Sequence, residues 1–347
     1  MSTKSVNKSV TNINLSRVIK ILISSFRPGF INEECQRMIT AVSPNAKLQD
    51  VTEWVNAGRK GDFTFKEQLD ARLAEAEVIF GSVVSRDIMA RSPKLKWVQT
   101  MNAGVETVLD TDIMQSRVML TNAGGIHGIP MREFVLHFML MFAKQALLCF
   151  QLQQEKRWQT FIPEMLHSKT CGILGLGKIG GEVARLSKAI GMRVIALDIR
   201  RMARAKYVDV MLPPERLREL LSESDFVVIA LPLIPETTGF IGEAELHAMK
   251  PTAYLINIAR GKIVDEEALI RALKERWIAG AGLDALATEP LPVDSKLWEL
   301  PNVILSPHVA GVSPNYNVTV TKLFCENLRH YLNGEKLFNV VNKKKGF

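Results

Sequence analysis

The stretch TCGILGLGKIG, residues 170–180, decides the fold. Its first half is apolar and is typical of a buried strand, and a helical pattern begins at Lys178. Gly175, Gly177 and Gly180 have the spacing GxGxxG. In that context Gly175 permits a tight turn, Gly177 lets backbone N–H groups approach a pyrophosphate, and Gly180 lets the helix pack closely on the strand. We therefore expect a dinucleotide-binding α/β domain, with the phosphates at the helix N-terminus. The cofactor contacts expected here are Gly175, Gly177, Lys178, Ile179 and Gly180.

Further apolar stretches continue the alternation of strand and helix along the chain. After the glycine motif they are VIALD (194–198), FVVIALP (226–232), AYLINIA (253–259), IAGAGLD (278–284) and NVILSP (302–307). A shorter series precedes the motif, namely RVIKILISS (17–25), EVIFGSV (77–83) and LKWVQTM (95–101), with a helix-like segment at 65–77. Strands that alternate with helices predict parallel sheets joined by crossover helices, one sheet for each series.

The nucleotide preference depends on the end of the strand that follows the glycine motif. Asp198 stands there, where a carboxylate can accept hydrogen bonds from the ribose hydroxyls of the adenosine. The same charge repels a 2′-phosphate, which favours NAD. Arg200 and Arg201 follow at once and could hold a 2′-phosphate, so NADP stays open.

Several polar side chains follow strands of the second series. They are Arg260 in NIARG, Asp284 and Glu289 in DALATEP, and His308 in SPHVAG. In open α/β sheets, ligands bind outside the carboxyl ends of the strands, so an arginine, two carboxylates and a histidine are expected to converge on the cofactor. For His127, near the expected domain junction, a loop role is the better interpretation.

From about Leu95 to Asn333 the sequence resembles the D-isomer-specific 2-hydroxyacid dehydrogenases. The resemblance rests on the glycine motif, LPLIPETTGFIG (231–242), NIARGKIVDEEAL (257–269), the D-x-x-x-x-E-P segment and SPHVAG, in the family's order. It implies an α/β fold in which a Rossmann-type doubly wound parallel sheet is inserted into a second, flavodoxin-like α/β substrate domain. The NAD-binding domain is then expected at 123–307 and the substrate-binding domain at 1–122 and 308–347.

The resemblance also implies the roles of the candidate residues. Arg260 is the substrate-binding arginine, His308 the acid/base and Glu289 the partner of the histidine. The substrate carboxylate is bound by backbone N–H groups of the turn Asn102, Ala103, Gly104 and Val105. Further cofactor contacts are Leu231, Pro232, Ala259 and Asp284, the last at the nicotinamide. No metal site is expected.

The chemistry of 2-keto acid reduction explains why these residue types suffice. The carbonyl carbon needs a hydride and its oxygen needs a proton, and histidine titrates near neutrality, so it can both supply and recover that proton. A carboxylate beside the histidine stabilises the imidazolium. The planar fork of Arg260 can bind the substrate carboxylate and polarise the carbonyl. We therefore expect an NAD(P)-dependent oxidoreductase acting on small D-2-hydroxy acids and 2-keto acids.

Composition narrows the other possibilities. The 347 residues, 47% hydrophobic and 23% charged, indicate a globular chain of about two domains. The net charge of +8 suits a small anionic substrate, and no nucleic-acid or membrane partner is expected. The four cysteines show no metal-site spacing and the N-terminus shows no apolar signal, so we expect a cytoplasmic protein. A homodimer is expected because the helix after Pro130 is apolar on many sides and family relatives pair through this region.

Two alternatives stay open at this point. A corepressor or scaffold of the same fold could bind NADH without turnover, because fold alone does not determine function. The arginine, glutamate and histidine set favours catalysis over that reading. Formate dehydrogenase is disfavoured, because that relative pairs its histidine with glutamine and Glu289 stands here instead.

Overall fold

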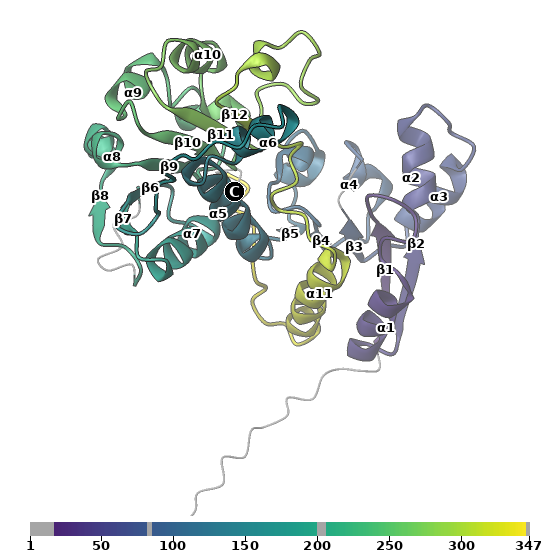
Figure 1. Cartoon of the computed structure of the whole chain (residues 1–347). Helices are drawn as coiled ribbons and strands as arrows, with labels where there is room; N and C mark the ends of the chain where they lie inside the picture. The colour runs from purple at the N-terminus through teal and green to yellow at the C-terminus, as the bar shows by residue number, and fades with distance from the viewer. Residues whose placement is uncertain (1–16, 82–84, 200–205, 345–347) are drawn as a thin grey trace, which may run out of the picture. The chain divides into compact units, whose positions relative to one another are not determined.

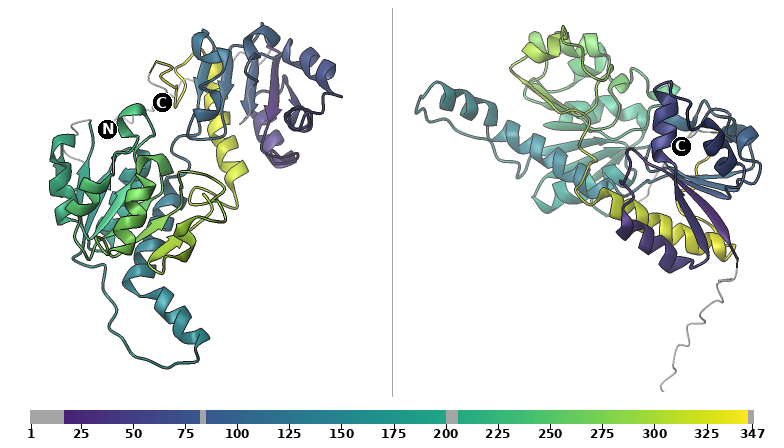
Figure 2. Two further views of the ribbon diagram at one scale, coloured as in Figure 1. Left: turned by 90° about the horizontal axis from the view of Figure 1, so that it is seen from above. Right: turned by 90° about the vertical axis from the view of Figure 1, so that its right-hand side faces the viewer.

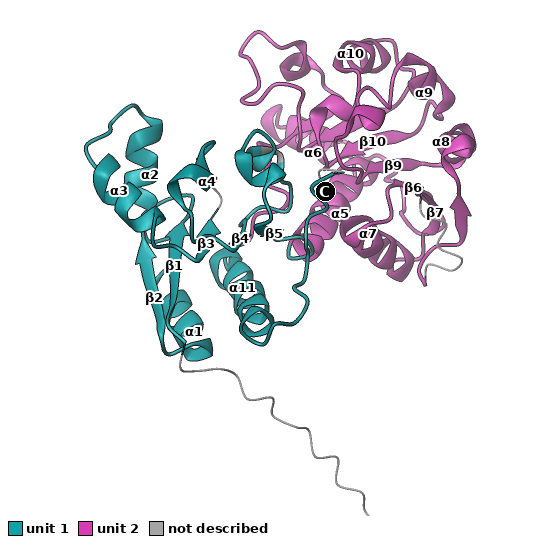
Figure 3. Ribbon diagram, turned by 180° about the vertical axis from the view of Figure 1, so that it is seen from behind, with its two compact units in different colours: residues 1–126, 314–347 teal, residues 127–313 magenta. Residues whose placement is uncertain are grey.

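The chain folds as two compact units, seen in a computed structural model that describes residues 17–81, 85–199 and 206–344. One unit is made of Met1–Ile126 and Pro314–Phe347, and the other, His127–Ser313, is inserted between those segments (Figure 3). The domain boundaries expected from the sequence, after 122 and after 307, lie a few residues before these observed boundaries. His308, expected in the first unit, therefore lies in the inserted unit. Its loop is attached there by Asp284, which accepts hydrogen bonds from the backbone N–H groups of Val309 and Ala310.

The first unit contains a five-stranded sheet in the order β2-β1-β3-β4-β5, in which every neighbouring pair is parallel (Figure 1). This is the flavodoxin-like order that the family resemblance predicts. The strands are β1 (Ile19–Ser24), β2 (Ala46–Asp50), β3 (Val78–Gly81), β4 (Trp97–Gln99) and β5 (Met119–Thr121). The helices are α1 (Glu33–Val42), α2 (Thr52–Arg59), α3 (Lys66–Leu73), α4 (Ile88–Arg91) and α11 (Tyr316–Leu332), with short 3₁₀ turns η1 (Glu106–Val108) and η2 (Asp112–Gln115). The end of the EVIFGSV segment, from Ser82, lies outside the described residues.

The C-terminal helix completes the core of this first unit. Phe324 of α11 stacks on Phe80 of β3 and Trp97 of β4, with ring centroids 4.2 Å and 5.1 Å apart. All three rings are fully buried. Stacked aromatic rings bury large apolar areas, so the segment after the inserted unit is an integral part of the first sheet's packing.

The inserted unit contains a seven-stranded parallel sheet in the order β12-β11-β10-β9-β6-β7-β8 (Figure 1). Its direction of winding reverses between β6 and β9, as in a Rossmann-type sheet. The strands are β6 (Thr170–Leu174), β7 (Arg193–Leu197), β8 (Val210–Leu212), β9 (Phe226–Ile229), β10 (Tyr254–Asn257), β11 (Gly280–Leu283) and β12 (Val303–Leu305). The helices are α5 (Gly128–Ala143), α6 (Ala146–Gln154), α7 (Lys178–Ala189), α8 (Leu217–Glu223), α9 (Glu243–Ala248) and α10 (Glu266–Lys274). Short 3₁₀ turns are η3 (Pro214–Arg216), η4 (Pro235–Thr237), η5 (Gly261–Ile263) and η6 (Lys296–Glu299).

Helices cover both faces of this sheet, which explains why β6, β9 and β11 are buried at every position. Along β9, Phe226 and Val228 join the cluster that includes α5 and α7, whereas Val227 and Ile229 join the cluster that includes α8, α9 and α10. Successive side chains of a strand point to opposite faces. A strand buried on both faces therefore reads as a continuous apolar run, as FVVIALP does.

The apolar stretch that begins near Pro130 is not one helix. It breaks between α5 and α6, where Gln145 has a left-handed φ of +51° and the two helices meet at a bend of 59°. Among the described residues, no single helix is long and apolar enough to cross a membrane, and only this bent pair reaches the required length and composition. The buried side of α5 packs in the core of the inserted unit with α7.

We expect Gly180→Ala to destabilise the protein by about 1–3 kcal/mol, because overpacking forces the backbone to shift. A Cβ at Gly180 would lie 2.0 Å from the carbonyl oxygen of Gly175, which α7 approaches closely. Gly181 is the matched control, since a Cβ there has no neighbour within 4 Å and alanine favours helix. Urea denaturation checks the difference. Equal midpoints for the two variants would contradict the predicted close packing.

Candidate active site

The glycine motif forms a sharp turn between β6 and α7. Gly175 has a φ of +94°, a conformation that glycine adopts without steric cost, and a Cβ there would lie 2.8 Å from the carbonyl oxygen of Ala230. Gly177 stands at the N-cap of α7 and no side chain caps the helix. The first-turn N–H groups of a helix have no partners within it and carry partial positive charge. The turn therefore fits the pyrophosphate of a dinucleotide.

Asp198 directly follows β7 and reaches back to this turn. Its Oδ2 accepts a hydrogen bond from the N–H of Leu176 at 2.8 Å, and the residue is only 7% exposed. The carboxylate thus helps to fix the main chain of the glycine turn. Arg200 and Arg201, which could hold the 2′-phosphate of NADP, lie outside the described residues.

Arg260 is presented by a turn that Asn257 organises. Asn257 ends β10, is 1% exposed, donates from Nδ2 to the carbonyl of Arg260 and accepts at Oδ1 from the N–H of Ala259, both at 3.0 Å. A Cβ at Gly261 would lie 1.9 Å from the carbonyl carbon of Leu286. The arginine turn is therefore packed directly against the segment that leads to Glu289. Sequence reasoning had no signal for the positioning role of Asn257.

The structure brings Glu289 and His308 together. Oε2 of Glu289 lies 2.8 Å from Nδ1 of His308, and Oε1 accepts from the N–H of Leu286 at 2.9 Å. The imidazole side chain is 45% exposed, so it is reachable from solvent. Among the described residues Nε2 has no hydrogen-bond partner. The carboxylate orients the ring through one nitrogen and leaves the other available for proton transfer.

Asp284 has partners that sequence reasoning did not foresee. It follows β11 and is 2% exposed, and its two oxygens accept hydrogen bonds from Ser306, Val309 and Ala310. All three donors belong to the loop that carries His308. The predicted nicotinamide contact of Asp284 stays a prediction, and the observed contacts are to the protein chain.

The remaining predicted cofactor residues follow β9 and β10 at the same edge of the sheet. Leu231 is half-buried, Pro232 is exposed and Ala259 is 7% exposed. His127 is half-buried beside the His308 loop, since a Cβ at Gly311 would lie 2.9 Å from its Cδ2. Burial and the positive charge of Arg260 lower the pKa of His127 to about 4, so this ring is neutral at pH 7. Within the described ranges no cluster of histidine, cysteine or acidic residues could hold a metal ion.

The predicted carboxylate-binding turn lies in the first unit, shortly after the end of β4. Two carbonyl groups of this turn accept hydrogen bonds. The carbonyl of Asn102 accepts from the N–H of Ala123, and the carbonyl of Ala103 accepts from Nδ2 of Asn122 at 2.7 Å. By contrast, the N–H groups of Ala103, Gly104 and Val105 find no acceptor among the described residues. A short row of unpaired backbone donors fits a carboxylate.

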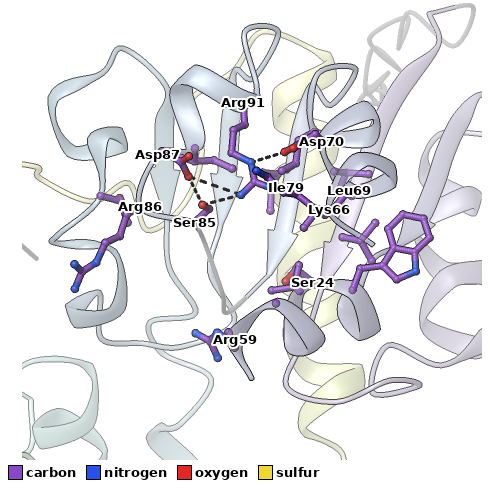
Figure 4. Close-up of a pocket in the computed structure, with 18 of the residues that line it drawn as sticks. Ser24, Arg59, Lys66, Leu69, Asp70, Ile79, Ser85, Arg86, Asp87 and Arg91 are labelled. Carbon is purple, nitrogen blue, oxygen red and sulfur yellow. Dashed lines mark hydrogen bonds and ion pairs between the residues drawn. The ribbon is translucent and has the colours of Figure 1, made fainter. Parts of the chain in front are cut away.

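The first unit also has a cavity of about 960 Å³ between α2, α3 and the α4 region (Figure 4). Nε of Arg91 pairs with Asp70 at 2.6 Å and its Nη1 donates to Ser85 at 2.9 Å, which joins the two walls. Lys66 and Leu69 line the same cavity. None of its lining residues has one of the predicted roles, and no sequence motif marks it.

Comparison with known proteins identifies the family of this chain. Residues 136–310 match the family model described as D-isomer specific 2-hydroxyacid dehydrogenase, NAD binding domain. The chain belongs to the D-isomer-specific 2-hydroxyacid dehydrogenase family. It is an NAD(P)-dependent 2-hydroxyacid dehydrogenase with an inserted Rossmann-type domain, as the sequence motifs predict.

Individual relatives cover most of the chain. A glyoxylate reductase from Korarchaeum cryptofilum is 36% identical over 268 residues, which is 75% of this chain and 80% of the relative. A D-isomer specific 2-hydroxyacid dehydrogenase from Xanthobacter autotrophicus, solved with NADPH and MES, has a TM-score of 0.81 at 29% identity and covers 95% of this chain and 99% of its own. An NADPH-dependent glyoxylate/hydroxypyruvate reductase from Sinorhizobium meliloti, solved with NADP and sulfate, has a TM-score of 0.79 at 25% identity, with 95% and 100% covered.

We expect Asp198→Asn to raise kcat/KM for NADPH relative to NADH by about 10-fold, because the amide no longer repels a 2′-phosphate. The asparagine oxygen can still accept from Leu176, which limits damage to the glycine turn. Steady-state kinetics with both nucleotides measure the ratio. Asp209→Asn is the control, since that carboxylate accepts from the N–H of Val194 at the other end of β7. An unchanged ratio in Asp198→Asn would show that this carboxylate does not set the preference.

Proposed function

We propose that this protein interconverts small 2-keto acids and D-2-hydroxy acids with NAD(P)(H), using His308 as the acid/base. The observation that supports the proposal is the contact of Glu289 with Nδ1 of His308, 2.8 Å long, on loops at the carboxyl edge of the nucleotide-binding sheet. Relatives named as glyoxylate reductases support glyoxylate and similar short keto acids as substrates. The substrate partner is then a small organic anion.

The residues of this chain divide the work of the reaction. When bound, the nicotinamide supplies or accepts the hydride at the substrate carbon. His308 donates a proton from Nε2 to the developing alkoxide and takes it back in the oxidative direction. Glu289 keeps the ring oriented through Nδ1 and stabilises the imidazolium. Arg260 supplies a planar pair of donors for the substrate carboxylate and carbonyl oxygen.

Two other groups are proposed to complete substrate and cofactor binding. The unpaired N–H groups of Ala103, Gly104 and Val105 bind the substrate carboxylate. The glycine turn holds the pyrophosphate, with Asp198 toward the ribose and Leu231, Pro232 and Ala259 beside the cofactor. Asp198 supports NAD as the preferred nucleotide, although the named structural relatives bind NADPH or NADP. A cytoplasmic location remains the prediction from the sequence.

We expect His308→Ala to lower kcat for glyoxylate or hydroxypyruvate by about 10²–10⁴-fold, because general acid/base catalysis is lost. The dissociation constant for NADH, measured by fluorescence titration, should change less than about 3-fold, since the ring is not part of the glycine turn. His247→Ala is the control, because His247 lies on α9 and its ring stacks on that of Trp277 with the ring centroids 3.8 Å apart. Unchanged turnover in His308→Ala would remove this residue from the mechanism. A wild-type protein that binds NADH but reduces no 2-keto acid would instead support the corepressor or scaffold alternative.

We also propose that the protein is a homodimer that pairs through an arm, defined as residues 146–165. Figure 2 shows α6 and the chain after it extending away from the sheet of the inserted unit. The arm exposes large apolar side chains, with Phe150 57% exposed, Ile162 90% and Trp158 completely exposed. Clustered exposed apolar groups of this kind typically mark protein–protein contacts.

Sedimentation velocity tests the dimer. We expect the wild type to sediment as a dimer, and Phe150→Asp combined with Ile162→Asp to sediment as a monomer, because charges at an apolar interface are costly. Val293→Asp is the matched control, since this side chain of the inserted unit is 98% exposed outside the arm. A monomeric wild type, or a monomer produced by the control alone, contradicts the assignment.

A further inference from the structure

His308 is held in a left-handed backbone conformation. Its φ is +55°, in a region that only a few per cent of non-glycine residues occupy, although asparagine, aspartate and histidine are enriched there. Such conformations persist where the surrounding structure determines them from several sides. The hydrogen bond with Glu289 holds the imidazole ring, but it does not hold the main chain of this loop. Some other group must do so.

Asp284 provides these contacts. Its Oδ1 accepts from Oγ of Ser306 at 2.5 Å and from the N–H of Val309 at 2.9 Å, and its Oδ2 accepts from the N–H of Ala310 at 3.0 Å. The carboxylate is 2% exposed, so the hydrogen bonds are shielded from water. Hydrogen bonds to an ionised acceptor are shorter and stronger than neutral ones, and a buried carboxylate requires them.

The three donors lie on both sides of His308 along the chain. Ser306 precedes it, and Val309 and Ala310 follow it, while the N–H of His308 donates to the carbonyl of Ser306 at 3.0 Å. The carboxylate of Asp284 therefore binds both ends of a short loop, and His308 lies between those two ends. The base of the loop is anchored as well, because the N–H of Ser306 donates to the carbonyl of Leu283 on β11.

We infer that Asp284 and Ser306 are positioning residues that hold the His308 loop in its left-handed conformation and so align the imidazole with Glu289 and the substrate. This inference rests on the proposed acid/base role of His308. Two carboxylates act on one histidine: Glu289 binds the ring and Asp284 binds the backbone around it. Among the described residues, Oδ2 of Asp284 accepts one hydrogen bond, so it can also bind the nicotinamide amide. Such a contact is compatible with the clamp, defined as the hydrogen bonds from Ser306, Val309 and Ala310 to Asp284. Ser306 serves the clamp alone, which makes it the better residue to test.

Ser306→Ala removes one hydrogen bond of the clamp without altering an ionisable group. We expect kcat to fall by about 10-fold, because small misplacements of a catalytic group have large effects on rate, while the dissociation constant for NADH stays within about 2-fold. Ser306→Thr keeps the hydroxyl and should restore most of the rate. Ser222→Ala is the matched control, since its hydroxyl donates to the carbonyl of Glu219 on the exposed side of α8 and its loss should leave kcat unchanged.

A double-mutant cycle decides whether Ser306 acts through His308. In a His308→Ala background, Ser306→Ala should have no further effect on the residual rate, because the group that it positions is gone. A 10-fold loss in both backgrounds would overturn the inference, and so would a loss confined to NADH affinity. A failure of the proposed function is a different result, since then His308→Ala alone leaves turnover unchanged.

Asp284→Asn gives an independent readout. The amide keeps the shape of the side chain but replaces one acceptor oxygen with a donor, which then faces a backbone N–H or the Ser306 hydroxyl. We expect kcat to fall by more than in Ser306→Ala, by about 10²-fold, and the pH dependence of kcat to change shape because the histidine is displaced from Glu289. A loss seen only as a raised KM for NADH, with an unchanged pH profile, would assign Asp284 to the cofactor and not to the loop.

Discussion

The parallel alignment of the seven-stranded sheet is the constraint on which the site depends. Because β6, β9, β10, β11 and β12 all run in one direction, their carboxyl ends lie along one edge. Each of these ends continues into a segment that carries a predicted functional residue, from the glycine turn to the His308 loop. Residues from distant parts of the chain therefore reach the same edge because the strands are parallel, although no single sequence motif contains them all. The apolar cores on both faces of the sheet hold the strands in register, so packing energy positions the polar edge.

Acidic side chains then fix the loops that leave this edge. Asp198 binds the backbone of the glycine turn, Asp284 binds the backbone around His308, and Glu289 binds the backbone of Leu286 as well as the imidazole. Each carboxylate accepts hydrogen bonds from N–H groups that would otherwise lack partners. Hydrogen bonds to a charged acceptor are stronger than neutral ones, so these carboxylates restrain the main chain of the loops. The same kind of contact thus holds both the glycine turn and the loop of the proposed acid/base His308 in one domain.

Much of the fold follows from sequence patterns, and the exceptions have physical reasons. Strands buried on both faces, such as β6 and β9, are continuous apolar runs and are recognised easily. The edge strands β2 and β8 and the three-residue β5 escape notice, because a short or half-exposed strand shows neither a run nor an alternation. The apolar stretch after Pro130 reads as one helix, but it bends at Gln145, whose left-handed backbone no composition rule predicts.

The sequence by itself determined the glycine spacing, the alternation of buried strands with helices, and the residue types that oxidation or reduction of a hydroxy acid requires. These properties are local, since each depends on neighbours a few positions away. Only the tertiary structure decided which atoms meet: that Glu289 contacts Nδ1 of His308 across 19 residues, and that Asp284 serves the loop of that histidine. Hydrogen bonds between separate loops depend on the twist and register of the strands beneath them. Those are set by side-chain packing across the whole sheet, which no single segment of the chain encodes.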